Sequence, residues 1–299
     1  MAMLEAADRS PAAPLAKQTG AAYLGSRLGW TALYALLIGW SAISLVSTGW
    51  IVMSSLKDNQ GLFADVWALP KVPQWINYAN AWQKSHMNRY FVNSVAVSGA
   101  SVAITGLVAA MASYVLARFR FRGDRVLLLL FIAGLAVPLQ LILVPIYLLY
   151  NRLHLLNSLP GLTLLYVTVS LPFSIFVLTG FFRTLPRELE ESAVLDGANE
   201  FQVFWSIMLP LAGPGLYTVS IFNFLNIWNE YTFALFLLSD TQKMTVPVGI
   251  YNLRNVQGAG GDWGSMIAGL IIILVPTLIF YLIFQNRIAA GMTAGALKG

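Results

Sequence analysis

Long apolar segments alternate with short polar ones along most of the chain. Six of them reach the roughly 20 residues that a helix needs to cross a hydrocarbon core of about 30 Å: residues 30–53, 92–117, 126–150, 159–182, 209–238 and 266–284. The segment 209–238 is long enough for its first residues to lie outside the bilayer. The pattern therefore predicts an all-α membrane protein with six transmembrane helices.

The composition supports a membrane protein and excludes several other classes. Hydrophobic residues make up 58% of the 299 positions and charged residues only 10%, whereas soluble domains carry about 25% charged residues. The net charge of +5 comes from basic residues scattered among apolar segments, which indicates membrane orientation rather than nucleic-acid binding. The chain has no cysteine, and its two histidines, His86 and His154, are far apart, so no metal site is expected.

Basic residues in one short connection predict the orientation. Arg118, Arg120, Arg122 and Arg125 surround Asp124 between the second and third segments. By the positive-inside rule this link lies in the cytoplasm, which places both chain ends and residues 183–208 on the same side. The predicted organisation is a flexible cytoplasmic tail (1–28), a six-helix membrane domain (29–287) and a cytoplasmic C-terminal tail (288–299). Residues 183–208 form a cytoplasmic loop, and residues 239–263 form an outer loop.

The loop 183–208 carries the signals of two short helices. Thr184 is placed to cap the first helix, and Gly197 falls where a left-handed residue commonly ends one. Asn199 and Gln202 have the spacing of a capping box at the start of the second helix. The sequence thus predicts a helix, a break at Gly197 and a second helix.

Three aromatic residues of the second helix, Phe201, Phe204 and Trp205, are spaced to share one face. One interpretation is that this face docks into a groove of a partner protein. The other is an amphipathic helix that lies against the protein's own helix ends or the lipid headgroups. Helical spacing alone does not separate the two.

Polar residues and prolines inside the apolar segments suggest a polar path. Glu230 is the one acid within a segment, and burying a charge there costs about 2.5–3.5 kcal/mol, so it should face a cavity or another helix. The alternative is a hydrated position near the outer helix end. Asn229 and Gln140 are further candidates for this path. Prolines that can break helices occur at Pro138, Pro145, Pro172 and Pro276.

Motifs for ATP hydrolysis and other chemistry do not occur in the sequence. There is no phosphate loop, no H-E-x-x-H zinc motif and no pair of intramembrane carboxylates. The chain itself is therefore not expected to be an enzyme, and an ATP-driven transporter would need a separate ATPase. Two alternatives are a secondary transporter of small polar solutes, which would need ion-coupling carboxylates, and a membrane enzyme, which would need catalytic residues.

The loop 183–208 resembles the EAA motif of ABC-importer permeases. The matching residues are Glu191-Ser192-Ala193, then Asp196-Gly197, and Leu209-Pro210 downstream, with Ser192 where the family pattern has alanine. The resemblance implies a coupling helix that sits in a cleft of a cytoplasmic ATPase. The implied coupling residues are Glu191, Ser192, Ala193, Asp196, Gly197, Phe201, Phe204, Trp205, Leu209 and Pro210.

Other stretches are similar to the carbohydrate-uptake, maltose-type branch of that family: residues 54–57, 90–94, 228–230 and 291–299. The resemblance implies a bacterial or archaeal plasma membrane, a second permease, two ATPase subunits that bind ATP and Mg, and an extracytoplasmic sugar-binding protein. The outer loop would reach the binding protein, with Tyr251, Asn252 and Arg254 as candidate contacts. In the maltose system the sugar is held mainly by the other permease, so a sugar contact on this chain does not follow.

Overall fold

The computed structural model describes residues 20–83, 86–257 and 261–296, and the chain divides into two units, residues 1–51 and 52–299. The first unit contains most of helix α1 (Gly20–Ser55). Residues 29–55 of this helix have a mean hydropathy of 1.7 and can span a membrane. Residues 1–19 of the predicted tail (1–28) lie outside the described residues. The remaining residues, 20–28, belong to α1.

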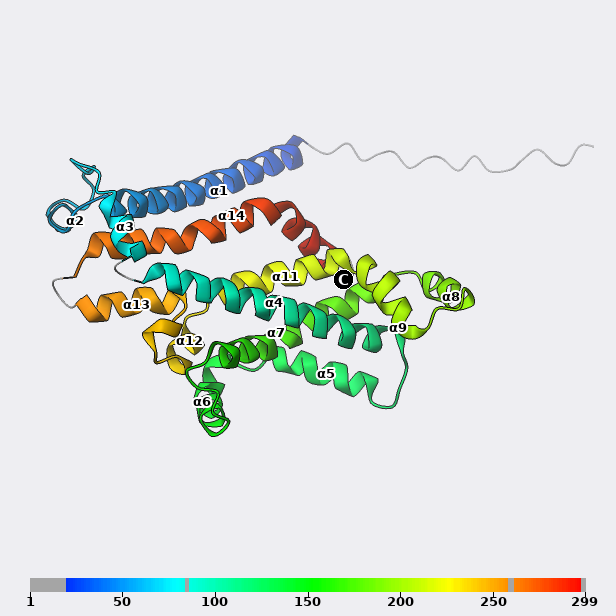
Figure 1. Cartoon of the computed structure of the whole chain (residues 1–299). Helices are drawn as coiled ribbons and strands as arrows, with labels where there is room; N and C mark the ends of the chain where they lie inside the picture. Colours follow the sequence, from blue (N-terminus) through cyan, green and yellow to red (C-terminus); the bar gives the residue numbers. More distant parts are fainter. Residues whose placement is uncertain (1–19, 84–85, 258–260, 297–299) are drawn as a thin grey trace, which may run out of the picture. The chain divides into compact units, whose positions relative to one another are not determined.

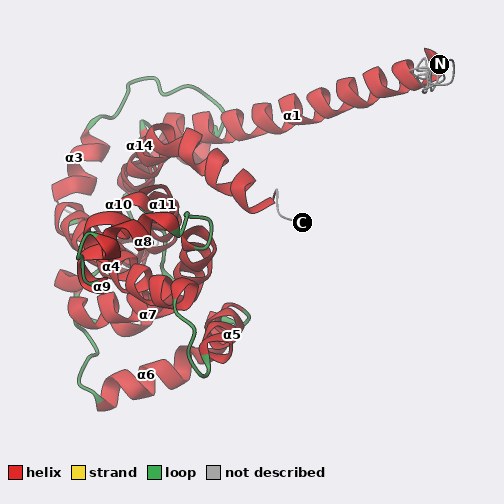
Figure 2. Cartoon of the chain, turned by 90° about the vertical axis from the view of Figure 1, so that its right-hand side faces the viewer, coloured by secondary structure: helices red, strands yellow, loops and turns green. Residues whose placement is uncertain are grey.

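The second unit is built from helices and loops, and the described residues contain no strand (Figure 2). This confirms the predicted all-α class. In chain order the helices are α2 (Asn59–Ala64), α3 (Ile76–Gln83), α4 (Met87–Arg118), α5 (Asp124–Leu135), α6 (Leu143–Arg152), α7 (Leu159–Phe182), α8 (Glu188–Leu195), α9 (Glu200–Val203), α10 (Leu209–Leu211), α11 (Gly213–Trp228), α12 (Thr232–Leu237), α13 (Val246–Gln257) and α14 (Trp263–Ala296). Two 3₁₀ turns, η1 (Leu139–Ile142) and η3 (Thr241–Lys243), and a π turn, η2 (Phe204–Met208), complete the described elements.

Four of the described helices are long and apolar enough to cross a membrane, and two bent pairs bring the total to six if each pair is one span. The third predicted segment was wrong as a single straight helix, because α5 and the segment Leu139–Arg152 meet at 93°. Pro138 lies at the bend, where its ring and missing N–H prevent the helix from continuing. Pro145 lies in the first turn of α6, where no intrahelical N–H bond is needed.

The fifth predicted segment, residues 209–238, was also wrong as one helix. The segment Glu200–Leu211 meets α11 at 68°, and Pro214 lies at the second position of α11. At the other end α11 stops at Trp228, and α12 begins only at Thr232. Glu230 therefore lies in a break between two helices. In contrast, α14 runs to Ala296 and so extends through most of the predicted tail 288–299.

Helices α4 and α7 pack side by side at the centre of the second unit (Figure 1). Gly106, Ala109 and Ala110 of α4 are buried, and small residues allow two helix backbones to approach closely in a membrane. Ser113 Oγ of α4 donates to the carbonyl oxygen of Ile175 in α7 (3.1 Å). α11 also packs against both of these helices.

Two clusters of buried side chains lie toward opposite ends of α4 and α7. One includes Met87 and Tyr90 at the start of α4, together with residues of α12 and α13. The other includes Tyr114 near the end of α4, together with residues of α8 and α9. Figure 1 shows α8 and α9 at one end of α4, and α12 and α13 at the other. The predicted cytoplasmic and outer loops therefore lie at opposite ends of the same bundle.

Candidate coupling loop and polar cavity

The loop between α7 and α11 has the predicted break and the predicted second cap. Gly197 has φ of +87°, the left-handed conformation that favours glycine. Asn199 Oδ1 accepts from the N–H of Gln202 (2.9 Å), and the Gln202 side chain accepts from the N–H of Asn199 (2.9 Å). The predicted cap at Thr184 was wrong. Its hydroxyl donates to the carbonyl oxygen of Phe181, and α8 begins only at Glu188.

The three aromatic residues do not form one exposed face. Phe204 is buried, and its ring centroid lies 5.3 Å from that of Tyr114 in α4. Phe201 is 67% exposed and Trp205 is 38% exposed. Trp205 lies one turn after Phe201, and their ring centroids are 6.0 Å apart. Phe204 therefore anchors the loop to the bundle, while Phe201 and Trp205 remain accessible.

The other predicted coupling residues divide in the same way. Ala193 is buried on the inner side of α8. Leu195 at the end of α8 is 88% exposed, although the spacing did not single it out. The predicted residues Glu191, Ser192, Asp196, Gly197 and Pro210 are exposed, and Leu209 is half-buried.

An ion pair that the sequence analysis missed fixes α8 to the end of α4. Arg118 pairs with Glu190, and Arg118 Nη2 donates to the carbonyl oxygen of Leu185 (2.9 Å). The Arg118 side chain is only 5% exposed. Burial raises the pKa of the Glu190 carboxyl, while the positive charges of Arg118 and Arg187 oppose this rise. The sequence showed Arg118 as one of four arginines and Glu190 as one of several glutamates, without a signal that pairs them.

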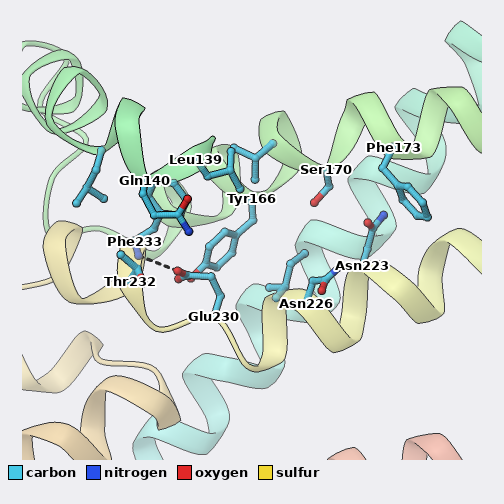
Figure 3. Close-up of a pocket in the computed structure, with 13 residues that line it drawn as sticks. Leu139, Gln140, Tyr166, Ser170, Phe173, Asn223, Asn226, Glu230, Thr232 and Phe233 are labelled. Carbon is cyan, nitrogen blue, oxygen red and sulfur yellow. Dashed lines mark hydrogen bonds between the residues drawn. The ribbon is translucent and has the colours of Figure 1, made fainter. Parts of the chain in front are cut away.

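A cavity of about 410 Å³ lies among η1, α6, α7, α11 and α12 (Figure 3). Of the predicted path residues, Gln140 and Glu230 both line it. Asn229 does not line this cavity, and its Nδ2 donates to the carbonyl oxygen of Leu225 in its own helix (2.8 Å). The full lining consists of Leu139, Gln140, Leu143, Tyr166, Val169, Ser170, Phe173, Asn223, Asn226, Ile227, Glu230, Thr232 and Phe233.

Glu230 is held in place by three donors at the edge of this cavity. Tyr166 Oη donates to Glu230 Oε2 (2.6 Å) from α7. The N–H groups of Phe233 (2.8 Å) and Ala234 (3.2 Å) donate to Oε1 and Oε2, respectively. Glu230 thus caps the start of α12, where backbone N–H groups have no helical partner and a negative charge is favoured.

Asn223 and Asn226 are cavity residues that the sequence analysis did not identify. Together with Glu230 they are spaced at i, i+3 and i+7, which is one face of a helix. This spacing could have identified both asparagines from the sequence as neighbours of Glu230. Asn223 Nδ2 donates to Ser174 Oγ of α7 (2.9 Å), so it also joins α11 to α7. Ser170 and Phe173 reach the cavity from α7, without a comparable pattern in the sequence.

The outer loop contains η3 and α13. The ring of Tyr251 is exposed and lies 5.5 Å from the ring of Tyr231. Asn252 and Arg254 belong to α13, but their side chains lie outside the described residues. Within the part of the chain that the structure describes, no three His, Asp or Glu side chains are grouped as a metal site requires.

Comparisons with known proteins agree on one family of transport proteins. A family model described as binding-protein-dependent transport system inner membrane component matches residues 103–292. The diacetylchitobiose uptake system permease protein NgcG of Streptomyces coelicolor is 38% identical over 298 residues, which covers 98% of this chain and 99% of that protein. The trehalose transport system permease protein SugB of Mycobacterium tuberculosis is 35% identical over 231 residues, covering 77% and 84% of the two chains.

Solved structures share the fold at lower sequence identity. A bacterial ABC transporter involved in the import of the acidic polysaccharide alginate matches with a TM-score of 0.74 at 22% identity, covering 88% of this chain and 97% of that chain. A bacterial alginate ABC transporter in complex with an alginate pentasaccharide-bound periplasmic protein matches with a TM-score of 0.62 at 17% identity, covering 89% and 98%. At these sequence identities, the structural similarity supports a shared fold and no more.

Proposed function

Since this chain belongs to the family of binding-protein-dependent transport system inner membrane components, we propose that it is a permease subunit of an ATP-driven importer for a sugar or oligosaccharide. It forms half of a translocation pathway beside a second permease and does no chemistry itself. ATP and Mg are bound by two partner ATPase subunits. The observation that carries this proposal is the near full-length match, at 38% identity, to a permease of a diacetylchitobiose uptake system.

The loop of α8 and α9 suits the ATPase contact. Leu195 and Phe201 expose apolar side chains on this loop, while Ala193 and Phe204 fasten it to the bundle. A firmly held loop with exposed apolar side chains is a surface that a partner's cleft can cover. We place this loop and both chain ends in the cytoplasm, because the arginines around Asp124 lie at the same end of α4.

The outer loop suits contact with the sugar-binding protein. α13 lies at the end of the bundle opposite to α8 and α9 (Figure 1). A bacterial transporter of similar fold forms a complex with an alginate-loaded periplasmic protein, which supports a binding protein as a partner. Tyr251 is the described candidate for the contact, because its ring is 41% exposed.

The polar cavity is our candidate for this chain's part of the pathway. Gln140, Ser170 and Asn226 offer amide and hydroxyl groups, and Phe173 offers an aromatic ring. Sugars present hydroxyl groups and apolar ring faces, which such a lining can bind. In the assembled transporter, a second permease packed beside this chain would complete the site.

The arrangement around Glu230 argues against the alternative of an ion-coupled secondary transporter. Such a transporter needs a carboxylate that can exchange an ion or a proton during transport. The Glu230 carboxylate already accepts from Tyr166, Phe233 and Ala234. A group held in this way stabilises a helix end and is poorly suited to reversible ion binding.

Reconstitution with the sister permease, the ATPase and the binding protein tests the proposal. Uptake into liposomes would be measured for diacetylchitobiose, trehalose and maltose, together with ATP hydrolysis. We expect one of these sugars to be taken up only when Mg-ATP is present on the side of the ATPase subunits. Ionophores that collapse ion gradients should have no effect on the uptake rate. Uptake that follows an ion gradient without ATP would refute the ATP-driven importer.

A further inference from the structure

Helix α4 connects the two ends of the second unit, and polar side chains hold a different segment at each end of it. Its 32 residues make it about 48 Å long at 1.5 Å per residue. Of the other long helices described in residues 52–296, α7 contains Pro172 and α14 contains Pro276, whereas α4 contains no proline. Because proline is one cause of sharp kinks, the absence of proline suits α4 to be a continuous link between the two ends.

At its start, α4 holds the backbone that leads into α13. Asn93 Nδ2 donates to the carbonyl oxygens of Gln242 (3.0 Å) and Met244 (2.9 Å). Ser94 Oγ accepts from the N–H of Val246 (2.9 Å), the first residue of α13. Asn93 and Ser94 are buried, so water does not compete for these bonds. Their loss would leave buried backbone groups without partners.

Two further contacts restrain the same segment. Gly249 in α13 packs against the ring of Tyr90 in α4 so closely that a Cβ at position 249 would collide with it. Asn157 lies in the turn before α7. Its side-chain Oδ1 accepts from the N–H of Asp240 (3.0 Å), and the main-chain carbonyl oxygen of Asn157 accepts from Lys243 Nζ (2.9 Å). α13 is therefore not a loosely attached loop, because its first turns are fixed to α4.

At its end, α4 holds the segment that leads into α8. Arg118 is the last residue of α4, and its side chain reaches both Glu190 and the carbonyl oxygen of Leu185. Tyr114, one turn earlier, packs against Phe204 of the same loop. Arg118 is 5% exposed in its side chain, so it is shielded from a protein docked on the loop.

We propose that Asn93 and Arg118 are positioning residues that join α13, α4 and α8 into one moving body. A shift imposed on α13 by the binding protein would then reach α8, and hence the ATPase, through α4. This inference rests on the proposed function and deepens it by naming the connection between the two partner sites. Both side chains are buried, so they act through the segments they hold and not by touching either partner.

The test measures how strongly a sugar-loaded binding protein stimulates ATP hydrolysis by the assembled transporter. One variant is Asn93→Leu, which keeps the side chain's size and removes its two donated bonds. The other is the double variant Arg118→Met with Glu190→Met, which removes the ion pair without leaving one charge buried alone. The matched controls are Asn88→Leu, at an exposed position of α4, and Arg152→Met, at an exposed position of α6.

We expect the stimulation of ATP hydrolysis to fall about fivefold or more in both test variants. The stimulating protein is the binding protein loaded with diacetylchitobiose, or with whichever sugar stimulates the parental complex. Basal hydrolysis should stay within about twofold of the parental rate, because the ATPase contact itself is unchanged. Arg118→Lys should give intermediate stimulation, since it keeps the charge and loses the planar fork of donors. The controls should behave as the parental complex does.

Parental stimulation in either test variant would overturn the inference. A parallel loss of basal hydrolysis and stimulation would also overturn it, because the residues would then serve folding or ATPase docking alone. A failure of the proposed function is seen separately. In that case no sugar-loaded binding protein would stimulate the parental complex, before any variant is compared.

Discussion

Glu230 illustrates how one residue can satisfy two constraints. Its carboxylate lies in the break between α11 and α12, where it accepts from one side chain and two backbone N–H groups. It also lines the polar cavity. Of the two interpretations from sequence, the cavity position agrees with the structure, while hydration near the outer helix end stays a prediction. A helix end beside a cavity satisfies the charge without a cationic partner.

The hydrogen bonds of Glu230 predict a graded series of variants. Glu230→Leu removes the acceptor of three donors, and each unpaired buried donor costs about 1–3 kcal/mol. Glu230→Gln keeps one acceptor oxygen, and Tyr166→Phe removes only one donor. Initial uptake rates should therefore fall most for Glu230→Leu, less for Glu230→Gln and least for Tyr166→Phe. Rates would be normalised to the amount of inserted protein, and normal uptake by Glu230→Leu would contradict the assigned role.

Gly197 predicts an effect that comes from the backbone alone. Its φ is +87°, and nothing lies within 4 Å of a Cβ placed there. A non-glycine residue in this conformation costs about 1–2 kcal/mol, with asparagine tolerated better than other residues. The rate of ATP hydrolysis stimulated by the loaded binding protein should thus fall least in Gly197→Asn, more in Gly197→Ala and most in Gly197→Val.

Gly180→Ala is the matched control for this series, because Gly180 is helical and also has open space around its Cβ position. It should leave coupling unchanged and add up to about 1 kcal/mol of helix stability. Equal coupling in Gly197→Val and the parental protein would show that the left-handed break is dispensable.

At the level of single residues, the sequence predicted what depends on local spacing. Gly197 and the pair Asn199 and Gln202 have the expected conformation and capping bonds, because turn and cap chemistry involves neighbours in the chain. The Arg118–Glu190 pair could not be predicted, because it joins positions that only the packing of α4 and α8 brings together. The roles of the coupling and path residues remain predictions.

At the scale of elements, the α8–α9 loop separates residues that hold it from residues that are available to a partner. Leu195 and Phe201 are among its most exposed apolar side chains. Leu195→Asp should weaken copurification of the ATPase about tenfold or more, because buried apolar anchors dominate docking energies. Leu69→Asp is the matched control, since Leu69 is 79% exposed on a different loop. Unchanged ATPase recovery with Leu195→Asp would exclude this residue from the interface.

The elements also show where apolar pattern alone is insufficient. Four of the six predicted segments correspond to long apolar helices, whereas the other two correspond to helix pairs bent by 93° and 68°, which hydropathy did not reveal. Pro138 and Pro214 mark those bends, yet Pro172 lies inside α7 without ending it. Whether a proline breaks a span depends on which neighbouring groups satisfy the freed backbone, and that depends on tertiary packing.

For the whole molecule, the family predicted from residues 191–210 is confirmed by the family match and by relatives that align over most of the chain. The carbohydrate branch was predicted from further stretches, residues 54–57, 90–94, 228–230 and 291–299. The identity of the sugar, by contrast, was not predicted from this chain, because under the proposed function partner proteins also contribute to selectivity. The full lining of the cavity was not predicted either, because it comes from three separate stretches of the chain, residues 139–143, 166–173 and 223–233.

The orientation of the whole chain is a prediction that cysteine labelling can decide, because the chain contains no cysteine of its own. Ser192→Cys and Ser239→Cys are conservative changes at exposed positions on the two opposite loops. In intact cells a membrane-impermeant maleimide should label Ser239→Cys and leave Ser192→Cys unlabelled until the membrane is permeabilised. The physical reason is that the arginines around Asp124 favour a cytoplasmic position for the α8 end. Labelling of Ser192→Cys from outside would reverse the orientation, and an ATPase contact at α8 and α9 would then be impossible.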